Sequence, residues 1–150
     1  MSRPGLTAFL RRHRRVALDT SVFIYQLDAT PGYFDVVHPI FHWLEGPAGD
    51  AVTSTVTMLE LLVQPYRAAD LDRVNRFYAS LSTYPNLDWV PHTLAIADQA
   101  ARLRAMHRLQ TPDAIQAATA LAAGASGLVT NDAAFRRVPE LDVLLVDDLL

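Results

Sequence analysis

The chain has 150 residues, of which 51% are hydrophobic and none is cysteine, a length that fits one domain burying roughly 70% of its unfolded surface. The absence of cysteine excludes disulfides and thiolate metal sites, and no apolar run approaches the ~20 residues of a membrane span. With no cysteine and no membrane span, we expect a cytoplasmic, single-domain protein over residues 1–150. The net charge of −3 argues against a general nucleic-acid-coating protein.

The first 15 residues contain a short cluster of arginines, Arg11, Arg12, Arg14 and Arg15, after a brief apolar piece. This order is the reverse of a secretory signal, in which the charged residues come first. We interpret residues 1–15 as an arginine-rich N-terminal extension. It is most simply a solvated basic arm and alternatively a local patch for nucleic acid.

From residue 16 onward, short apolar runs alternate with helical patterns. In chain order, the first elements expected are a strand at 16–18, helices at 20–27 and 33–44, a strand at 51–54 and a helix at 55–63. Pro39 is expected to start or interrupt the second helix, and Pro65 to stop the third.

The second half continues the same alternation. The elements expected there are a helix at 69–82, a strand at 87–90, helices at 93–109 and 112–123, a strand at 127–130, a short helix at 132–138 and a strand at 143–146. Gly124 stands where a glycine C-cap is expected. Because the strands are continuously apolar, they indicate a parallel sheet covered on both faces. We therefore predict a three-layer α/β/α domain with a central, mainly parallel sheet of four to five strands.

Two acids stand at the carboxyl ends of predicted strands. Asp19 comes after the strand at 16–18, and Asp132 follows the strand at 127–130 in GLVTND. In a parallel sheet, ligands bind in the crevice beyond the carboxyl ends of the strands. Each acid also has a structural explanation, since either one can cap the helix that begins after it. Position alone leaves both interpretations open.

Two further acids lie in largely apolar helices. Asp113 falls in the first turn of its helix, just after Pro112, where the helix dipole favours an anion. Glu60 closes a Thr57-x-x-Glu60 pattern that resembles a capping box, but a helix starting near Thr55 would place it beyond the first turn among apolar neighbours. Carboxylates in such surroundings favour a divalent cation with oxygen ligands. If the four acids converge, they resist full ionisation until a cation arrives.

Other catalytic templates lack their key residues. The chain has no GxSxG, GxxxxGK[ST] or GxGxxG, which excludes the nucleophile elbow, the P-loop and the dinucleotide fingerprint. A phosphatase or phosphotransferase using Asp19 as nucleophile stays open as an alternative. Haloacid-dehalogenase-like enzymes, however, need a second Asp two residues on, where this chain has Ser21. A receiver domain needs a lysine, and the chain has none.

Four segments taken together resemble one family. They are LDTSVFIY (18–25), TSTVTMLELL (53–62), TPDAIQAATALAAGASGLVTNDAAF (111–135) and VLLVDD (143–148). In this order and spacing they are similar to a PIN domain, and more closely to the VapC-type toxins of bacterial toxin–antitoxin pairs. The resemblance covers the chain after about residue 15, so the arginine-rich extension is a departure from it.

This resemblance implies a metal-dependent endoribonuclease that uses one or two Mg²⁺ or Mn²⁺ ions. Its acidic quartet would be Asp19, Glu60, Asp113 and Asp132. Asp19 and Asp113 are expected as direct ligands, and Glu60 and Asp132 as ligands or as groups that orient water. Hydroxyl neighbours would be Thr20, Ser21 and Thr130. Candidate contacts to the RNA backbone are Arg11, Arg12, Arg14, Arg15, Arg102, Arg104, Arg136 and Arg137.

The resemblance also implies partners. A small VapB-like antitoxin would wrap the toxin and block its site, and the toxin would form a homodimer. We expect an apolar groove for the antitoxin around residues 33–44 and 59–66. The alternatives are a free-standing PIN nuclease outside a toxin pair and a non-catalytic PIN scaffold or binding module.

Overall fold

The computed structural model describes residues 4–150. Within them lie the strands β1 (Val16–Leu18), β2 (Ala51–Ser54), β3 (Leu87–Val90), β4 (Gly127–Thr130) and β5 (Asp142–Leu145). They form one sheet in the order β3-β2-β1-β4-β5, and every neighbouring pair is parallel. The predicted parallel sheet is therefore confirmed, with five strands in the described residues.

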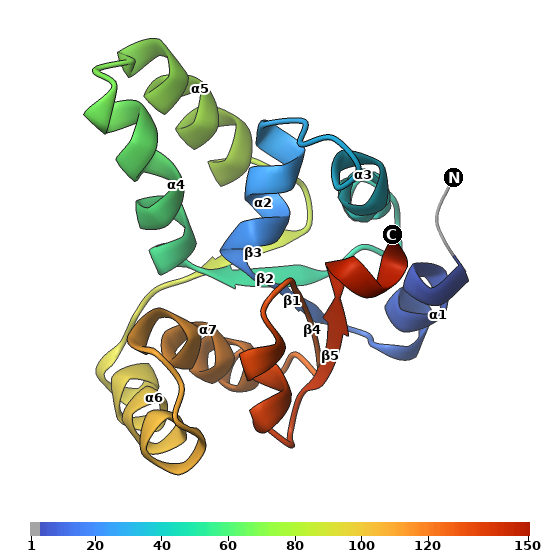
Figure 1. Cartoon of the computed structure of the whole chain (residues 1–150), viewed down its shortest axis with the longest axis vertical. Coiled ribbons are helices and arrows are strands. Elements are labelled where there is room, and N and C mark those ends of the chain that lie inside the picture. The colour runs from blue at the N-terminus through green and yellow to red at the C-terminus, as the bar shows by residue number, and fades with distance from the viewer. Residues whose placement is uncertain (1–3) are drawn as a thin grey trace.

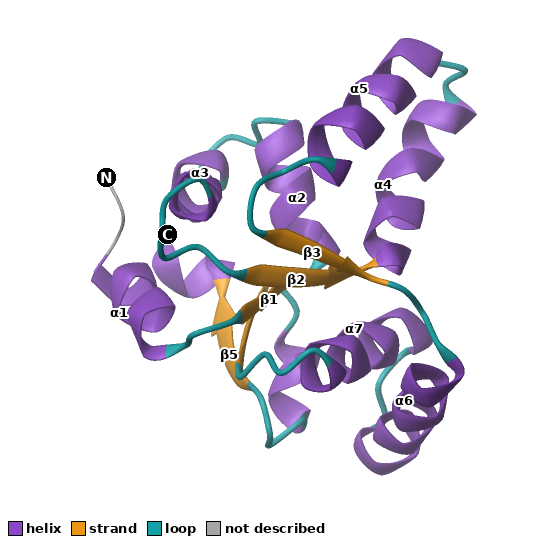
Figure 2. Cartoon of the chain, turned by 180° about the vertical axis from the view of Figure 1, so that it is seen from behind, coloured by secondary structure: helices purple, strands orange, loops and turns teal. Residues whose placement is uncertain are grey.

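Helices cover both faces of the sheet. They are α1 (Pro4–Arg12), α2 (Thr20–Leu27), α3 (Phe34–Leu44), α4 (Thr55–Arg67), α5 (Leu71–Ser82), α6 (Leu94–His107) and α7 (Thr111–Ala122), followed by the 3₁₀ helices η1 (Ala133–Arg137) and η2 (Val146–Leu149). Helices α2 to α5 lie on one face and α6 and α7 on the other (Figures 1 and 2). This is the predicted three-layer α/β/α fold. No helix in the described part of the chain is long and apolar enough to cross a membrane.

Successive strand residues supply two separate cores. Val16 and Leu18 pack into the core under α2 and α3, whereas Ala17 between them packs into the core under α6 and α7. In β4, Leu128 and Val129 divide in the same way. Because alternate side chains of a strand point to opposite faces, a sheet covered twice needs apolar residues at every position. This explains the continuously apolar runs.

The two prolines behave differently from expectation. Pro65 was predicted to stop a helix, but α4 runs on to Arg67, so that prediction is wrong. Proline removes a single backbone donor, and here its ring is buried only two residues before the helix ends. Pro39 lies inside a continuous α3.

Gly124 follows the end of α7 with φ +78°, as expected of a C-cap glycine.

The N-terminal segment is a packed helix, which corrects the expected solvated arm. Leu6 and Phe9 of α1 are buried in the core, and His13 bonds the Asp142 carboxylate at 2.6 Å. A Cβ at Gly127 would lie 2.7 Å from the Phe9 ring, so only glycine lets the helix approach β4 this closely. Residues 1–3 of the predicted extension lie outside the described residues.

Candidate active site

Four acidic side chains meet beyond the carboxyl ends of the central strands. Asp19 follows β1, Asp132 follows β4, Asp113 stands in the first turn of α7, and Glu60 stands in α4 after β2. The parallel sheet brings these strand ends to one edge, so four distant segments contribute to one crevice. The charges of the other three acids all act on Asp113. The structure thus brings the predicted quartet together.

Crowding of the acids changes their ionisation. Burial raises the pKa of Asp113 to about 6, and the nearby charges of Asp132 and Asp19, a hydrogen bond with Asp132 and the charge of Glu60 act in the same direction. Burial also raises the pKa of Asp19, although hydrogen bonds from Thr130 and the Thr20 backbone oppose this shift. Proton release from these two carboxyls is therefore disfavoured in the cation-free protein.

Asp19 is held by both of its carboxylate oxygens. Oδ1 accepts a 2.8 Å hydrogen bond from the Thr20 backbone N–H, and Oδ2 accepts a 2.7 Å bond from the Thr130 hydroxyl. The same hydroxyl accepts a 3.1 Å bond from the N–H of Asp132, whose Oδ1 accepts from Ala134 N–H at 2.9 Å. Asp19 and Asp132 therefore cap α2 and η1 while also facing the crevice.

Glu60 differs from its expected surroundings. Ser54 caps α4 by accepting a 3.1 Å bond from Val56 N–H, so the Thr57-x-x-Glu60 pattern is not a capping box. Glu60 is exposed rather than set among apolar neighbours. Its Oε1 accepts a 2.8 Å bond from the Thr20 hydroxyl. Its position is therefore explained by the crevice and not by helix capping.

A buried network of polar side chains lies behind Glu60. The amide of Gln116 donates to the Thr57 hydroxyl at 2.6 Å, and Thr57 also lies 2.8 Å from the Thr53 hydroxyl. The Thr20 hydroxyl, which reaches Glu60, lies 3.3 Å from the Thr57 hydroxyl. The sequence-based prediction missed Gln116, although an amide side chain among the small apolar residues of AIQAATALAA was an available signal. Gln116 of α7 is therefore connected to Glu60 through the hydroxyls of Thr57 and Thr20.

The predicted hydroxyl neighbours divide into two groups. Thr20 and Thr130 each bond an acid of the quartet. The Ser21 hydroxyl is buried and has no hydrogen-bond partner among residues 4–150. It therefore does not support any of the four acids directly.

A second network joins the closing segment to the site. The Asn131 amide donates to the Tyr25 hydroxyl at 2.9 Å and accepts from Asp147 N–H at 2.9 Å. Tyr33 donates to the Asp147 carboxylate at 2.8 Å and stacks on Tyr25 with ring centroids 4.3 Å apart. Asn131, between Thr130 and Asp132, was not among the predicted residues. The network ties η2 to Asn131, the residue between Thr130 and Asp132.

No basic side chain neutralises the quartet within the described residues, because none of their ion pairs includes these four acids. Among residues 4–150, no group of three or more histidine, aspartate or glutamate side chains is arranged so that it could hold a metal ion as it stands. Carboxylate oxygens with unbalanced negative charge suit a hard divalent cation. The residues therefore fit Mg²⁺ or Mn²⁺ by charge and by ligand type.

The N-terminal arginines lie away from the acids. Arg12 pairs with Asp142 at 2.8 Å, and Arg15 pairs with Asp50 at 3.0 Å. Asp50 precedes β2 and Asp142 begins β5, so both pairs lie at the amino ends of the strands, opposite the crevice. Arg11 and Arg14 are exposed.

The remaining predicted arginines lie on the α6, α7 and η1 side of the fold. Arg102 pairs with Asp98 at 3.6 Å, and Arg136 pairs with Asp148 at 2.9 Å. Arg137 donates to a backbone carbonyl, that of residue 108, at 3.0 Å. Arg104 donates through Nε to the carbonyl of Leu109 at 3.1 Å and has no ion-pair partner among the described residues.

Comparison with known proteins places this geometry in a family. A family model described as the PIN domain matches residues 16–141. The fold resembles FitAcB from Neisseria gonorrhoeae, with TM-score 0.69, 21% identity, and coverage of 89% of this chain and 99% of that chain. It also resembles VapBC-1 from nontypeable Haemophilus influenzae, with TM-score 0.67, 19% identity, and coverage of 89% and 98%.

A third similar structure is Mycobacterium tuberculosis VapC20, described as a sarcin–ricin loop cleaving toxin. It has TM-score 0.62 and 19% identity, covering 81% of this chain and 92% of that chain. No curated protein sequence matches the chain. At these sequence identities, the similarity to solved structures establishes the fold alone. The family model matches most of the chain, from β1 onward, and does not include α1. The chain belongs to the PIN domain family.

Proposed function

We propose that this protein is a metal-dependent endoribonuclease that hydrolyses RNA phosphodiester bonds and acts as the toxin of a toxin–antitoxin pair. The observation that carries the proposal is the convergence of Asp19, Glu60, Asp113 and Asp132 with no basic partner among the described residues. Membership of the PIN family supports it. So does a fold shared with VapC20, which is described as a cleaving toxin.

The four acids would hold one or two Mg²⁺ or Mn²⁺ ions. Such an ion, when bound, supplies positive charge at the phosphodiester oxygens and lowers the pKa of a coordinated water. Asp19 is proposed as one ligand because bonds from Thr20 and Thr130 fix both of its oxygens. Asp113 is proposed as the other, since its charge is disfavoured until a cation compensates it.

The remaining acids would act on water. Glu60 and Asp132 are exposed at the crevice, and each has one carboxylate oxygen already engaged by the protein. The free oxygens are available to ligate the cation or to orient the attacking water and accept its proton. In hydrolysis the water oxygen bonds to phosphorus, the bond to the leaving oxygen breaks, and that oxygen takes up a proton.

The direct test is RNA cleavage by the purified protein with Mg²⁺, with Mn²⁺ and with EDTA. Cleavage should require the metal, and Asp19→Asn or Asp113→Asn should abolish it while leaving the circular dichroism spectrum unchanged. Asp70→Asn is the matched control, because Asp70 also caps a helix through a backbone N–H but stands at the start of α5. Asn variants that cut RNA like the wild type, or a phosphorylated Asp19 trapped during turnover, would contradict the proposal.

An antitoxin partner is part of this proposal. The similar structures include toxin–antitoxin complexes, among them one from Klebsiella pneumoniae with TM-score 0.65 and 23% identity. Large apolar side chains are exposed on α4 and α5, namely Leu59, Tyr66, Leu71 and Tyr78. Most apolar residues of α3 are buried in the core, but Pro39 and Trp43 are only partly buried and line a cavity of about 550 Å³ with Leu10 of α1, so part of the predicted groove at 33–44 is open. Exposed apolar surface of this kind is typical of an interface.

Co-expression with the adjacent short reading frame tests the partner. A bound antitoxin should co-purify with the protein and inhibit RNA cleavage, and Leu59→Asp should weaken the complex without affecting cleavage by the free protein. A homodimer of the protein is proposed on the resemblance, and light scattering of the free protein tests it. If no neighbouring frame encodes an inhibitor, the nuclease is free-standing.

A further inference from the structure

We propose that a groove along the seam between α6 and α7, with Arg104 at its centre, binds the phosphodiester backbone of the RNA strand that enters the acidic crevice. The inference rests on the proposed ribonuclease function and adds a binding site to it. RNA is a polyanion, and the crevice itself presents four carboxylates. Positively charged groups next to the crevice are therefore needed to hold the strand.

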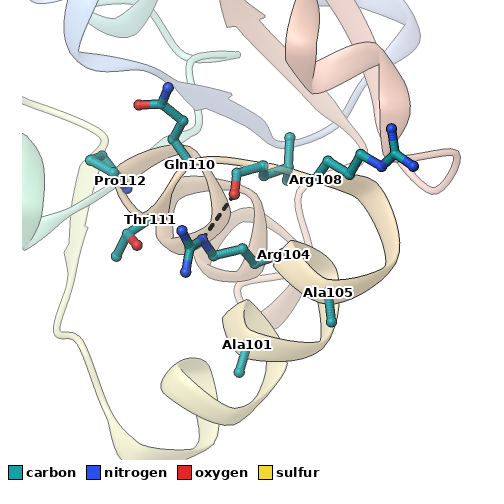
Figure 3. Close-up of a pocket in the computed structure, with 8 residues that line it drawn as sticks. Ala101, Arg104, Ala105, Arg108, Gln110, Thr111 and Pro112 are labelled. Carbon is teal, nitrogen blue, oxygen red and sulfur yellow. Dashed lines mark hydrogen bonds between the residues drawn. The ribbon is translucent and has the colours of Figure 1, made fainter.

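The groove consists of two adjoining cavities. The larger, of about 780 Å³, extends from Ala101 and Arg104 to Pro112, and the smaller, of about 270 Å³, extends toward His92. Both are lined by Ala101, Arg104 and Thr111, so they form one continuous depression. Alanine side chains of α6 leave the space open (Figure 3). The larger cavity reaches Pro112, the residue before Asp113 in the chain.

Arg104 is held so that its charge faces this groove. Its Nε donates a 3.1 Å hydrogen bond to the carbonyl of Leu109, which fixes the side chain across the α6–α7 connection (Figure 3). Among residues 4–150 its terminal nitrogens have neither a hydrogen-bond acceptor nor an ion-pair partner. Arginine stays charged at all physiological pH values, and its planar fork matches the geometry of phosphate. Arg104 is thus a positioned cation with free donors.

Neighbouring arginines are arranged differently. Arg102 pairs with Asp98 one helical turn away, and Arg136 pairs with Asp148. Arg108 lines the large cavity at its margin, but its guanidinium points away from Arg104 (Figure 3). The N-terminal arginines stand at the opposite edge of the sheet. Arg104 therefore combines free terminal guanidinium nitrogens, a side chain fixed through Nε, and a position in a groove that reaches Pro112, the residue before Asp113.

Two variants test the groove. Arg104→Ala removes the cation, and Ala101→Glu places a negative charge in the groove without touching Arg104. Both are made in an Asp19→Asn background, so that a fluorescent single-stranded RNA oligonucleotide stays intact during anisotropy measurements. We expect the affinity of both variants for the RNA to fall roughly ten-fold or more, which is the effect of losing one charge-assisted hydrogen bond. For Arg104→Ala, the slope of log K against log salt concentration should also become shallower by about 0.7. Arg102→Ala is the matched control and should bind RNA within two-fold, roughly, of its parent.

Cleavage kinetics give a second measurement. With Asp19 intact, Arg104→Ala and Ala101→Glu should raise KM for RNA while kcat stays nearly unchanged, because neither residue touches the reacting atoms. Thermal unfolding checks that both variants fold like the wild type. If the folded variants bind and cleave RNA like the wild type, the proposal that the groove binds RNA is wrong, and the ribonuclease proposal is unaffected. Wild-type protein that cleaves no RNA in Mg²⁺ or Mn²⁺ overturns the ribonuclease proposal, which is a separate result.

Discussion

The Thr130 hydroxyl donates a 2.7 Å hydrogen bond to Asp19 Oδ2 and so joins the carboxyl ends of β4 and β1 at the candidate active site. The bond also opposes the rise in the pKa of Asp19 that burial causes. Thr130→Val keeps the shape and loses the bond, so Asp19 should hold its proton more tightly and be less well oriented. Loss of such a supporting bond typically weakens metal binding about 10- to 100-fold.

Isothermal titration with Mn²⁺ measures this loss. Thr130→Ser is the matched control, because it keeps the hydroxyl in a fully buried position. The serine variant should bind Mn²⁺ nearly as well as the wild type. Equal Mn²⁺ affinity in the valine and serine variants would contradict a role for the Thr130 bond.

The stability of the metal-free protein should depend on Asp113. Its pKa in the folded chain is about 6, above the ordinary value of 3.8. The folded state therefore binds this proton more tightly than the unfolded chain. The stabilisation is complete below about pH 4 and is lost as the pH rises through about 6. Burial of Asp19 gives a shift in the same direction.

Asp113→Asn cannot ionise and should remove this contribution. Thermal unfolding in EDTA, compared between variant and wild type, should show similar Tm values near about pH 4 and a higher Tm for the variant near about pH 7. Saturating Mn²⁺ should restore the wild type at the higher pH. Asp70→Asn, outside the crevice, controls for the loss of a carboxylate as such. A constant Tm difference between Asp113→Asn and wild type at every pH would refute this account.

The strand positions and the sheet were accessible from the sequence, because they depend on local patterns. Gly127–Thr130, for example, is a short, mostly apolar run that begins with glycine and is followed by Asn131 and Asp132. The identity of the four acids came from their order in a family resemblance. Their convergence follows from parallel topology, since all the strands end at one edge.

What the sequence did not reveal depends on contacts between distant segments. The arginines of α1 suggested a solvated arm. The helix instead packs against β4, and it can do so because Gly127, a residue far from α1 in the chain, has no side chain there. Likewise, the apolar neighbours of Glu60 in sequence do not surround it in space. The bond from Gln116 to Thr57 joins α7 to α4, and no local pattern predicts such a pair.

That bond yields a prediction for Glu60. Thr57→Val leaves the buried Gln116 amide without its 2.6 Å acceptor, which should cost about 1–3 kcal/mol of unfolding free energy. It also removes the hydroxyl next to Thr20, which holds Glu60. The double variant Thr57→Val with Gln116→Leu removes both polar partners and should recover part of the stability, because the Ser54 N–H then loses its 3.4 Å bond to Gln116.

Urea unfolding and Mn²⁺ titration separate the two effects. Mn²⁺ affinity should stay reduced in the double variant even where stability returns, because Thr20 and Glu60 have still lost their support. Thr119→Val is the control, since that buried hydroxyl donates only within α7, to the carbonyl of Ile115. Full recovery of Mn²⁺ affinity together with stability would show that Thr57 has a structural role alone.

Gly127 should matter for folding and not for the candidate active site. In Gly127→Ala the new methyl group would lie 2.7 Å from the Phe9 ring and 2.8 Å from the His13 ring, so α1 must shift outward. Such overpacking typically costs about 1–3 kcal/mol, measured here by urea unfolding. Phe9→Leu in the same background removes the closest atom and should recover part of this loss. Because Gly127 begins β4 at the edge opposite the acids, Mn²⁺ affinity of the folded variant should be unchanged. Weaker Mn²⁺ binding would mean that α1 packing is coupled to the crevice across the sheet.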